Sequence, residues 1–172
     1  MVEGVHWNDV LSAEDVGWKL VASAVSDLGA MGATPRWCLL AISLPRPLDL
    51  DWAAAFARGL HAACSHWGLL LSGGDVTRSP GPRVLSLSVG GTSSAPVTRS
   101  GARPGDHLWV TGTLGNAAFG FFSGGEGLSA LRRPDPPVRL GTALAQHGLA
   151  TAMLDLSDGL RIDLARLCSA SG

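Results

Sequence analysis

The chain has 172 residues, of which 46% are hydrophobic, and its 13 basic and 14 acidic side chains leave a net charge of −1. This length suits one domain or one and a half small ones, with enough apolar residues for a core. The near balance of charge excludes the basic footprint of a nucleic-acid-binding protein, and no apolar run reaches the roughly 18 residues that span a bilayer.

The first predicted helix begins near residue 12. Ser12 and Asp15 have the spacing of a capping box, and apolar residues then recur at helical spacing up to Leu28. Gly29 or Gly32 can end the helix, because glycine adopts the left-handed conformation of a C-cap.

A strand and a second helix follow. Residues 37–44 form a short apolar run closed by prolines, which predicts a buried strand. Residues 50–67 have the apolar period of a helix, with Asp49 or Asp51 as its cap and Gly68 as its end.

Shorter elements make up the rest of the chain. Residues 68–71 predict a strand that leads into a Ser-Gly-Gly-Asp turn at 72–75, and residues 84–89 alternate like a strand with one wet face. The turn-rich segment 98–106 marks a domain boundary. Beyond it we expect strands at 107–112 and 153–156, helices at 115–122, 138–147 and 158–169, and a loop at 123–137.

The predicted fold class is α+β. Residues 1–97 would form a domain with a mixed or mostly antiparallel sheet backed by helices. Residues 98–172 would form an incomplete α/β domain, because no strand follows the last helix. The first six residues lack the basic and apolar regions of a signal peptide, so we expect a cytoplasmic protein without a membrane or nucleic-acid partner.

Four aspartates stand apart from ordinary surface acids. Asp27 interrupts an apolar helix, Asp75 follows two glycines after a strand, and Asp155 and Asp158 flank Ser157 where a strand meets a helix. Two carboxylates about 4 Å apart repel by roughly 4 kcal/mol at an effective dielectric near 20, so a cluster of them needs a counter-cation. Magnesium prefers such oxygen ligands and bridges carboxylates to phosphates. Phosphoryl transfer then requires positioning and charge neutralisation, with no side chain acting as acid or base.

Simpler interpretations exist for most of these positions. Asp158 or Ser157 could cap the last helix, and Asp75 could serve only as a turn former. A lone histidine such as His6 is more often a surface residue than a ligand. Asp27 is harder to explain in this way, because aspartate is a poor residue for a helix interior.

Missing motifs narrow the class of protein. The three cysteines, Cys38, Cys64 and Cys168, form no CxxC pair, which argues against a disulfide framework or a zinc site and favours small buried residues. There is no GxxxxGK[ST] motif, and the single lysine, Lys19, lies within the first helix. The protein-kinase signatures are also absent. Any nucleotide must therefore be held by another architecture.

Together, several segments resemble thiamine-monophosphate kinase, a member of the superfamily of aminoimidazole ribonucleotide synthetase. They occur in family order over nearly the whole chain: VEGVHW (Val2–Trp7), GWKLVASAVSDLGAMGATP (Gly17–Pro35), SGGDVTRS (Ser72–Ser79), TRSGARPGD (Thr98–Asp106), VTGTLG (Val110–Gly115) and DLSDGL (Asp155–Leu160).

The resemblance implies roles for particular residues. It implies magnesium ligands at Asp27, Asp75, Asp155 and Asp158, contacts to ATP at Gly74, Asp75, Arg99 and Ser157, and a contact to thiamine monophosphate at His6. The implied reaction is in-line transfer of the γ-phosphoryl group of ATP, assisted by several magnesium ions, giving thiamine diphosphate and ADP. The family also implies a homodimer formed through the first domain.

The chain departs from the family at both ends. Family members carry an aspartate-rich stretch before the VEGVH segment and continue well beyond the position of Gly172, so we expect a chain truncated at both ends. Two alternatives stay open: another ATP-using member of the superfamily, or a fragment that only binds nucleotide or dimerises.

Overall fold

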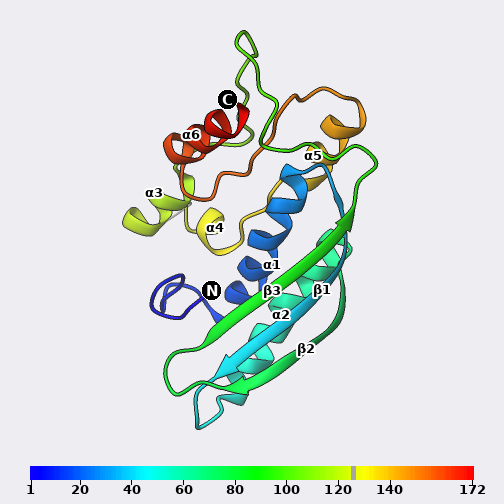
Figure 1. The fold of residues 1–172 in the computed structure, drawn as a ribbon. Coiled ribbons are helices and arrows are strands. Elements are labelled where there is room, and N and C mark those ends of the chain that lie inside the picture. Colours follow the sequence, from blue (N-terminus) through cyan, green and yellow to red (C-terminus); the bar gives the residue numbers. More distant parts are fainter. Residues whose placement is uncertain (125–126) are drawn as a thin grey trace. The chain divides into compact units, whose positions relative to one another are not determined.

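The computed structural model describes residues 1–124 and 127–172, in which the chain forms six helices and three strands (Figure 1). These residues divide into two compact units that alternate along the sequence. Unit 1 comprises Met1–Ala24, Pro35–Gly90 and Leu114–Asp135, and unit 2 comprises Val25–Thr34, Gly91–Thr113 and Pro136–Gly172. The domain boundary expected after residue 97 stays a prediction. No helix in the described part of the chain is long and apolar enough to cross a bilayer.

Unit 1 contains a three-stranded sheet in the order β2-β1-β3. β1 (Thr34–Leu44) and β2 (Leu70–Arg78) run parallel, and β3 (Val84–Thr92) runs in the opposite direction (Figure 1). α2 (Leu50–Trp67) connects β1 to β2 and covers one face of the sheet (Figure 1). This mixed sheet backed by helices confirms the predicted α+β class.

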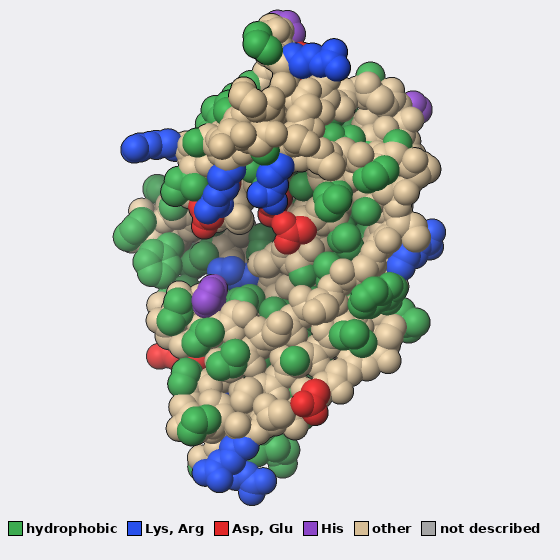
Figure 2. Space-filling model, viewed as in Figure 1, with side chains coloured by type: hydrophobic (Ala, Val, Ile, Leu, Met, Phe, Trp, Pro, Cys, Tyr) green, Lys and Arg blue, Asp and Glu red, His purple; other side chains and the backbone are tan. Residues whose placement is uncertain are grey.

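The core of unit 1 lies between the sheet and α2. Along β1, Cys38 and Ile42 are buried, whereas Trp37 and Leu39 point to the opposite face and are exposed. Figure 2 shows hydrophobic side chains spread over this uncovered face. The Sγ atoms of Cys38 and Cys64 lie 4.0 Å apart as free thiols. Burial and then the neighbouring Cys38 raise the pKa of Cys64 to about 12, which leaves an inert thiol.

α1 (Ala13–Ala30) begins with the predicted capping box. The Ser12 N–H donates to Oδ2 of Asp15 at 3.3 Å, and the Asp15 N–H donates to Oγ of Ser12 at 3.1 Å. α1 and α2 then cross at two glycines with almost no space between their backbones. A Cβ atom on Gly17 would lie 2.3 Å from the carbonyl oxygen of Phe56, and one on Gly59 would lie 1.8 Å from that of Glu14.

A later segment of the chain completes unit 1 with α3 (Asn116–Ser123) and α4 (Gly127–Arg132). The prediction of a loop over 123–137 is therefore wrong where α4 forms. Ion pairs and a hydrogen bond fix the end of this segment on α1: Arg133 pairs with Glu14 and Asp15, and the Trp18 indole N–H donates to the carbonyl of Pro134 at 2.9 Å. These contacts to residues 116–119 positions earlier hold the chain immediately after α4, a helix whose six residues would be marginal alone.

Unit 2 is built from the end of α1 together with α5 (Val138–Gln146) and α6 (Leu160–Ser171). Gly29 and Gly141 let α1 and α5 approach closely, since a Cβ atom on Gly141 would lie 2.1 Å from the carbonyl oxygen of Gly29. Within α6 only Asp163 is buried. Cys168 on this helix is exposed, which corrects the expectation that all three cysteines are buried.

The strands predicted at 107–112 and 153–156 do not form. Leu108, Trp109 and Val110 are exposed, and the N–H of Met153 donates to the carbonyl of Thr98 at 3.1 Å, which is no strand ladder. A strand exists only through hydrogen bonds to a neighbouring strand. No such neighbour lies beside these segments within residues 1–124 and 127–172.

Candidate nucleotide and metal site

Unit 2 places two aspartates and an arginine from distant parts of the sequence within electrostatic reach of one another. Asp27 lies near the end of α1, Arg99 follows β3, and Asp155 precedes α6. Burial and then the charge of Asp155 raise the pKa of Asp27, while the charge of Arg99 acts in the opposite direction. The ionised form of Asp27 is therefore disfavoured here, and a further cation would stabilise it.

The segment before α6 is held by a residue that sequence reasoning missed. Asp163 is 2% exposed, and its Oδ2 accepts the N–H of Ser157 at 3.0 Å and that of Asp158 at 2.9 Å. Burial alone would raise the pKa of Asp163, but these donors and the Arg166 guanidinium outweigh it and lower the pKa. Asp163 lies in the first turn of α6, but it accepts N–H groups five and six residues earlier, outside the spacing of a capping box.

The alternative that Asp158 or Ser157 caps α6 is wrong. The N-cap position is Gly159, with φ of 102°, and it makes no side-chain cap hydrogen bond. Since neither side chain caps the helix, the carboxylate of Asp158 is available for another role. It forms an ion pair with Arg166, which also donates from Nη1 to Oδ1 of Asp163 at 2.8 Å.

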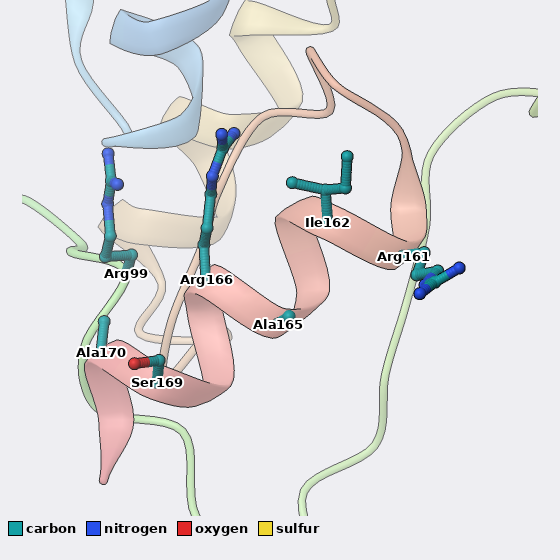
Figure 3. A pocket seen from close by; sticks show the side chains of 7 residues that line it. All are labelled: Arg99, Arg161, Ile162, Ala165, Arg166, Ser169 and Ala170. Carbon is teal, nitrogen blue, oxygen red and sulfur yellow. The ribbon is translucent and has the colours of Figure 1, made fainter.

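A shallow cavity of about 650 Å³ adjoins α6. It is lined by three arginines, Arg99, Arg161 and Arg166, and by Ile162 and small residues of the helix. Figure 3 shows the side chains of Arg99 and Arg166 extending in the same direction, while Arg161 points away from them. Guanidinium groups bind anions such as phosphate well, but Arg166 already pairs with Asp158 and Asp163, so Arg99 is the better candidate here.

Gly74 and Asp75 lie in unit 1, within β2. The Ser-Gly-Gly-Asp segment is not the predicted turn, because β2 extends through it, with Gly74 opposite Leu40 and Asp75 opposite Ala41. A Cβ atom on Gly74 would lie 2.0 Å from the carbonyl oxygen of Leu40, so the strand pairing itself requires glycine there. Asp75 is exposed. Its role towards metal or ATP, like that of Gly74, stays a prediction.

His6 is also in unit 1, at the end of a tight turn. Gly4 has φ of 77°, and the N–H of His6 donates to the carbonyl of Val2 at 2.9 Å. The Val2 N–H donates to Nδ1 of His6 at 3.0 Å, so the exposed ring carries its proton on Nε2 when neutral. The next residue, Trp7, is buried and anchors the turn.

The donor chemistry of the site fits magnesium shared with phosphate. In the described part of the chain, no three His, Cys, Asp or Glu side chains gather closely enough to hold a metal ion by themselves. Magnesium, however, is usually bound by one or two carboxylates together with substrate phosphates and water. The Asp27 and Asp155 pair supplies only oxygen donors, and the charge of Asp155 disfavours the ionised form of Asp27. The assignment of Asp27, Asp155 and Asp158 as metal ligands, and of Arg99 and Ser157 as ATP contacts, stays a prediction.

Comparison with known proteins adds evolutionary context. Residues 1–94 match the family described as "AIR synthase related protein, N-terminal domain". The chain is 38% identical to thiamine-monophosphate kinase of Salmonella typhimurium, over all of this chain and 56% of that protein, and 36% identical to the Escherichia coli K12 protein of the same name, over 99% and 55%. It spans about half the length of the curated relatives that it matches.

Solved structures agree with this result. The crystal structure of thiamine-monophosphate kinase from Stenotrophomonas maltophilia K279a has a TM-score of 0.87 and 37% identity, covering 98% of this chain and 57% of that one. The structure described as "AaThiL complexed with AMPPCP and TMP" has a TM-score of 0.92 and 30% identity, covering 100% and 58%. Because the family match includes more than half of its residues, the chain belongs to the AIR synthase related family.

Proposed function

We propose that this chain is part of a kinase that transfers the γ-phosphoryl group of ATP to thiamine monophosphate, giving thiamine diphosphate and ADP. Relatives named thiamine-monophosphate kinase match 99% or more of the chain at 36–38% identity. A structure with a TM-score of 0.92 holds AMPPCP and TMP. Within the molecule, the observation that carries the proposal is the pair of Asp27 and Asp155 with Arg99 beside it.

In this proposal, each residue near the phosphates has a defined task. Asp27 and Asp155, with Asp75 and Asp158, would hold several magnesium ions. Bound magnesium would neutralise charge as two anionic substrates approach each other. Arg99 would form charge-assisted hydrogen bonds to ATP oxygens, and Gly74, Asp75 and Ser157 would complete the ATP contacts.

His6 would bind the acceptor. Its Nδ1 already accepts a backbone hydrogen bond, so its Nε2 proton is free to be donated to the phosphate of thiamine monophosphate. The reaction needs no side chain as general acid or base, because in-line transfer between phosphates depends on positioning and charge. The cytoplasmic location expected from the sequence belongs to the same proposal.

Calorimetric titration with AMPPCP and Mg²⁺ tests this site. Asp27→Asn and Asp155→Asn should each weaken nucleotide binding at least about tenfold, a loss typical of residues that tune a metal site. Asp51→Asn is the matched control, since Asp51 is an exposed acid on α2. Unchanged affinity in both site variants would refute the assignment. Formation of thiamine diphosphate by the full-length protein would separate this kinase from other ATP-using relatives.

We further propose that a second copy of the chain covers the exposed face of the sheet. Trp37 and Leu39 on β1 and Leu70 on β2 lie on this face with 43–67% of their surface exposed. The Trp37 ring covers Gly90 of β3, where a Cβ atom would lie 2.3 Å from it. Exposed apolar side chains gathered on one sheet face are typical of a protein–protein interface, and a two-fold interface uses the same face of both copies.

A further inference from the structure

Arg166 is shared between a buried and an exposed carboxylate. Its Nη1 donates to Oδ1 of Asp163 at 2.8 Å and also forms an ion pair with Oδ2 of Asp158. Asp163 is 2% exposed and is fixed by the N–H groups of Ser157 and Asp158. The side chains of Asp158 and Arg166, in contrast, are 51% and 49% exposed. The inner contact is therefore anchored, while the outer contact lies at the surface and can exchange.

The outer contact conflicts with metal binding. A guanidinium on Oδ2 of Asp158 occupies lone pairs of that oxygen, so a divalent ion that binds through Oδ2 must displace it, and two cations on one carboxylate repel each other. We propose that Arg166 is an internal counter-cation, which neutralises Asp158 in the metal-free protein and must release it before Asp158 can bind a divalent ion. This inference rests on the proposed metal role of Asp158.

Two features make the exchange feasible. After release, Arg166 keeps its partner Asp163, so its charge is not left unpaired next to the helix. The contact that it gives up is an exposed ion pair, and such pairs are weak enough that the competition would reduce metal affinity only about two- to fivefold. Arg166 would therefore tune metal binding without blocking it.

Titration of the protein with Mn²⁺, followed by the electron paramagnetic resonance of the free ion and in the absence of nucleotide, tests the inference. Arg166→Gln should bind Mn²⁺ about two- to fivefold more tightly than the native chain, because the competitor is gone. Arg166→Lys should lie between the two, since lysine keeps the charge but not the planar fork.

Arg161→Gln is the matched control, because it removes the same charge from the same helix at a side chain that points away from Arg99 and Arg166 (Figure 3). If Arg166 had only a structural role, its loss would loosen the segment held by Asp163 and weaken Mn²⁺ binding. Unchanged or weaker binding in Arg166→Gln, measured against Arg161→Gln, would overturn the inference.

Asp158→Asn separates this inference from the proposed function. It should weaken Mn²⁺ binding at least about tenfold if Asp158 is a ligand, and Arg166→Gln should then have no further effect in that background. If Asp158→Asn leaves binding unchanged, the metal role of Asp158 is wrong. If Asp158→Asn weakens binding but Arg166→Gln does not tighten it, only the role of Arg166 is wrong.

Discussion

At the scale of single residues, the carboxylate of Asp27 lies where the fold disfavours its charge. Burial and the nearby Asp155 raise the pKa of Asp27 in the folded protein. The neutral carboxyl therefore favours folding below the unfolded pKa of about 3.9, and this contribution is lost as the pH rises through the higher pKa of the folded protein. A residue of this kind lowers the stability of the metal-free protein at neutral pH. The presence of an aspartate at this costly position in the helix is explained if its carboxylate binds a cation.

We therefore expect Asp27→Asn to separate stability from binding. In urea denaturation with EDTA at pH 7, the variant should be more stable than the native chain, because it removes a disfavoured charge. This advantage should disappear near pH 3, where native Asp27 is protonated. The same variant should lose at least about tenfold in Mn²⁺ affinity. A variant that is less stable at pH 7 would contradict this account.

Asp15 has the opposite pH dependence. Burial would raise its pKa, but hydrogen bonds from Arg133 and Ser12 outweigh burial and lower it. The ionised carboxylate of Asp15 therefore stabilises the fold above its unfolded pKa of about 3.9. This contribution is lost as the pH falls through the lower pKa of the folded protein. Asp15→Asn should cost about 0.5–2 kcal/mol at pH 7, as for other helix caps.

This loss should shrink progressively below about pH 4, where native Asp15 also becomes protonated. Urea denaturation at pH 7, 5 and 3 measures it. Asp51→Asn, which changes an exposed acid on α2, serves as the control and should show little change. A loss for Asp15→Asn that does not depend on pH would show that the ionised carboxylate is not responsible.

Residues with local partners were predictable from sequence, and residues with distant partners were not. Ser12 and Asp15 form a capping box and lie three positions apart, so the spacing in the sequence is enough to identify it. Asp163 bonds backbone groups five and six residues earlier, beyond any local cap pattern, and it was missed. The effect of Asp155 on Asp27 joins positions 128 residues apart and could be anticipated only through family resemblance.

At the scale of elements, helices were predicted more accurately than strands for the same reason. α2 begins and ends at the predicted residues, because Asp49 accepts the N–H of Trp52 and Gly68 adopts the left-handed conformation. The expected strands at 107–112 and 153–156 needed partners that their own sequence does not supply. In the Ser-Gly-Gly-Asp segment, two glycines favoured a turn, but β1 approaches Gly74 so closely that only glycine continues the strand there.

The crossing of α1 and α2 provides a test at this scale. Gly59→Ala would place a Cβ atom 1.8 Å from the carbonyl oxygen of Glu14, and backbone atoms cannot move aside as a flexible side chain can. We expect a loss of about 1–3 kcal/mol or more in the free energy of unfolding, as for an overpacked core. Gly81→Ala is the control, because nothing lies within 4 Å of its Cβ position.

Urea denaturation of both variants measures the difference. Alanine is a better helix former than glycine by about 1 kcal/mol, so propensity alone would make Gly59→Ala more stable. The two effects thus have opposite signs. A stabilised Gly59→Ala variant would show that the helices separate readily and that the crossing is not close-packed.

At the scale of the whole molecule, the exposed sheet face is the feature that a single copy of unit 1 leaves unexplained. α2 covers one face, and Trp37, Leu39 and Leu70 stay exposed on the other. The apolar run at 37–44 predicted a buried strand, and that prediction is wrong for Trp37 and Leu39, which are exposed. Sequence alone could not show which apolar side chains the helix would leave uncovered. That depends on tertiary packing, which also decides whether an edge strand such as β2 is protected.

Leu39→Glu tests whether a second copy covers this face. Burial of a leucine side chain contributes about 1.5–3 kcal/mol. In a two-fold dimer each copy contributes Leu39, so the substitution removes this contribution twice. The variant should therefore weaken dimerisation by about a hundredfold or more. Leu50→Glu is the control, because Leu50 is more exposed but lies at the start of α2, away from the sheet face. Sedimentation velocity over a range of concentrations should show a dimer for the native chain and for Leu50→Glu, and a monomer for Leu39→Glu. A native monomer, or a dimer that Leu39→Glu leaves intact, would show that this apolar face is not where two copies meet.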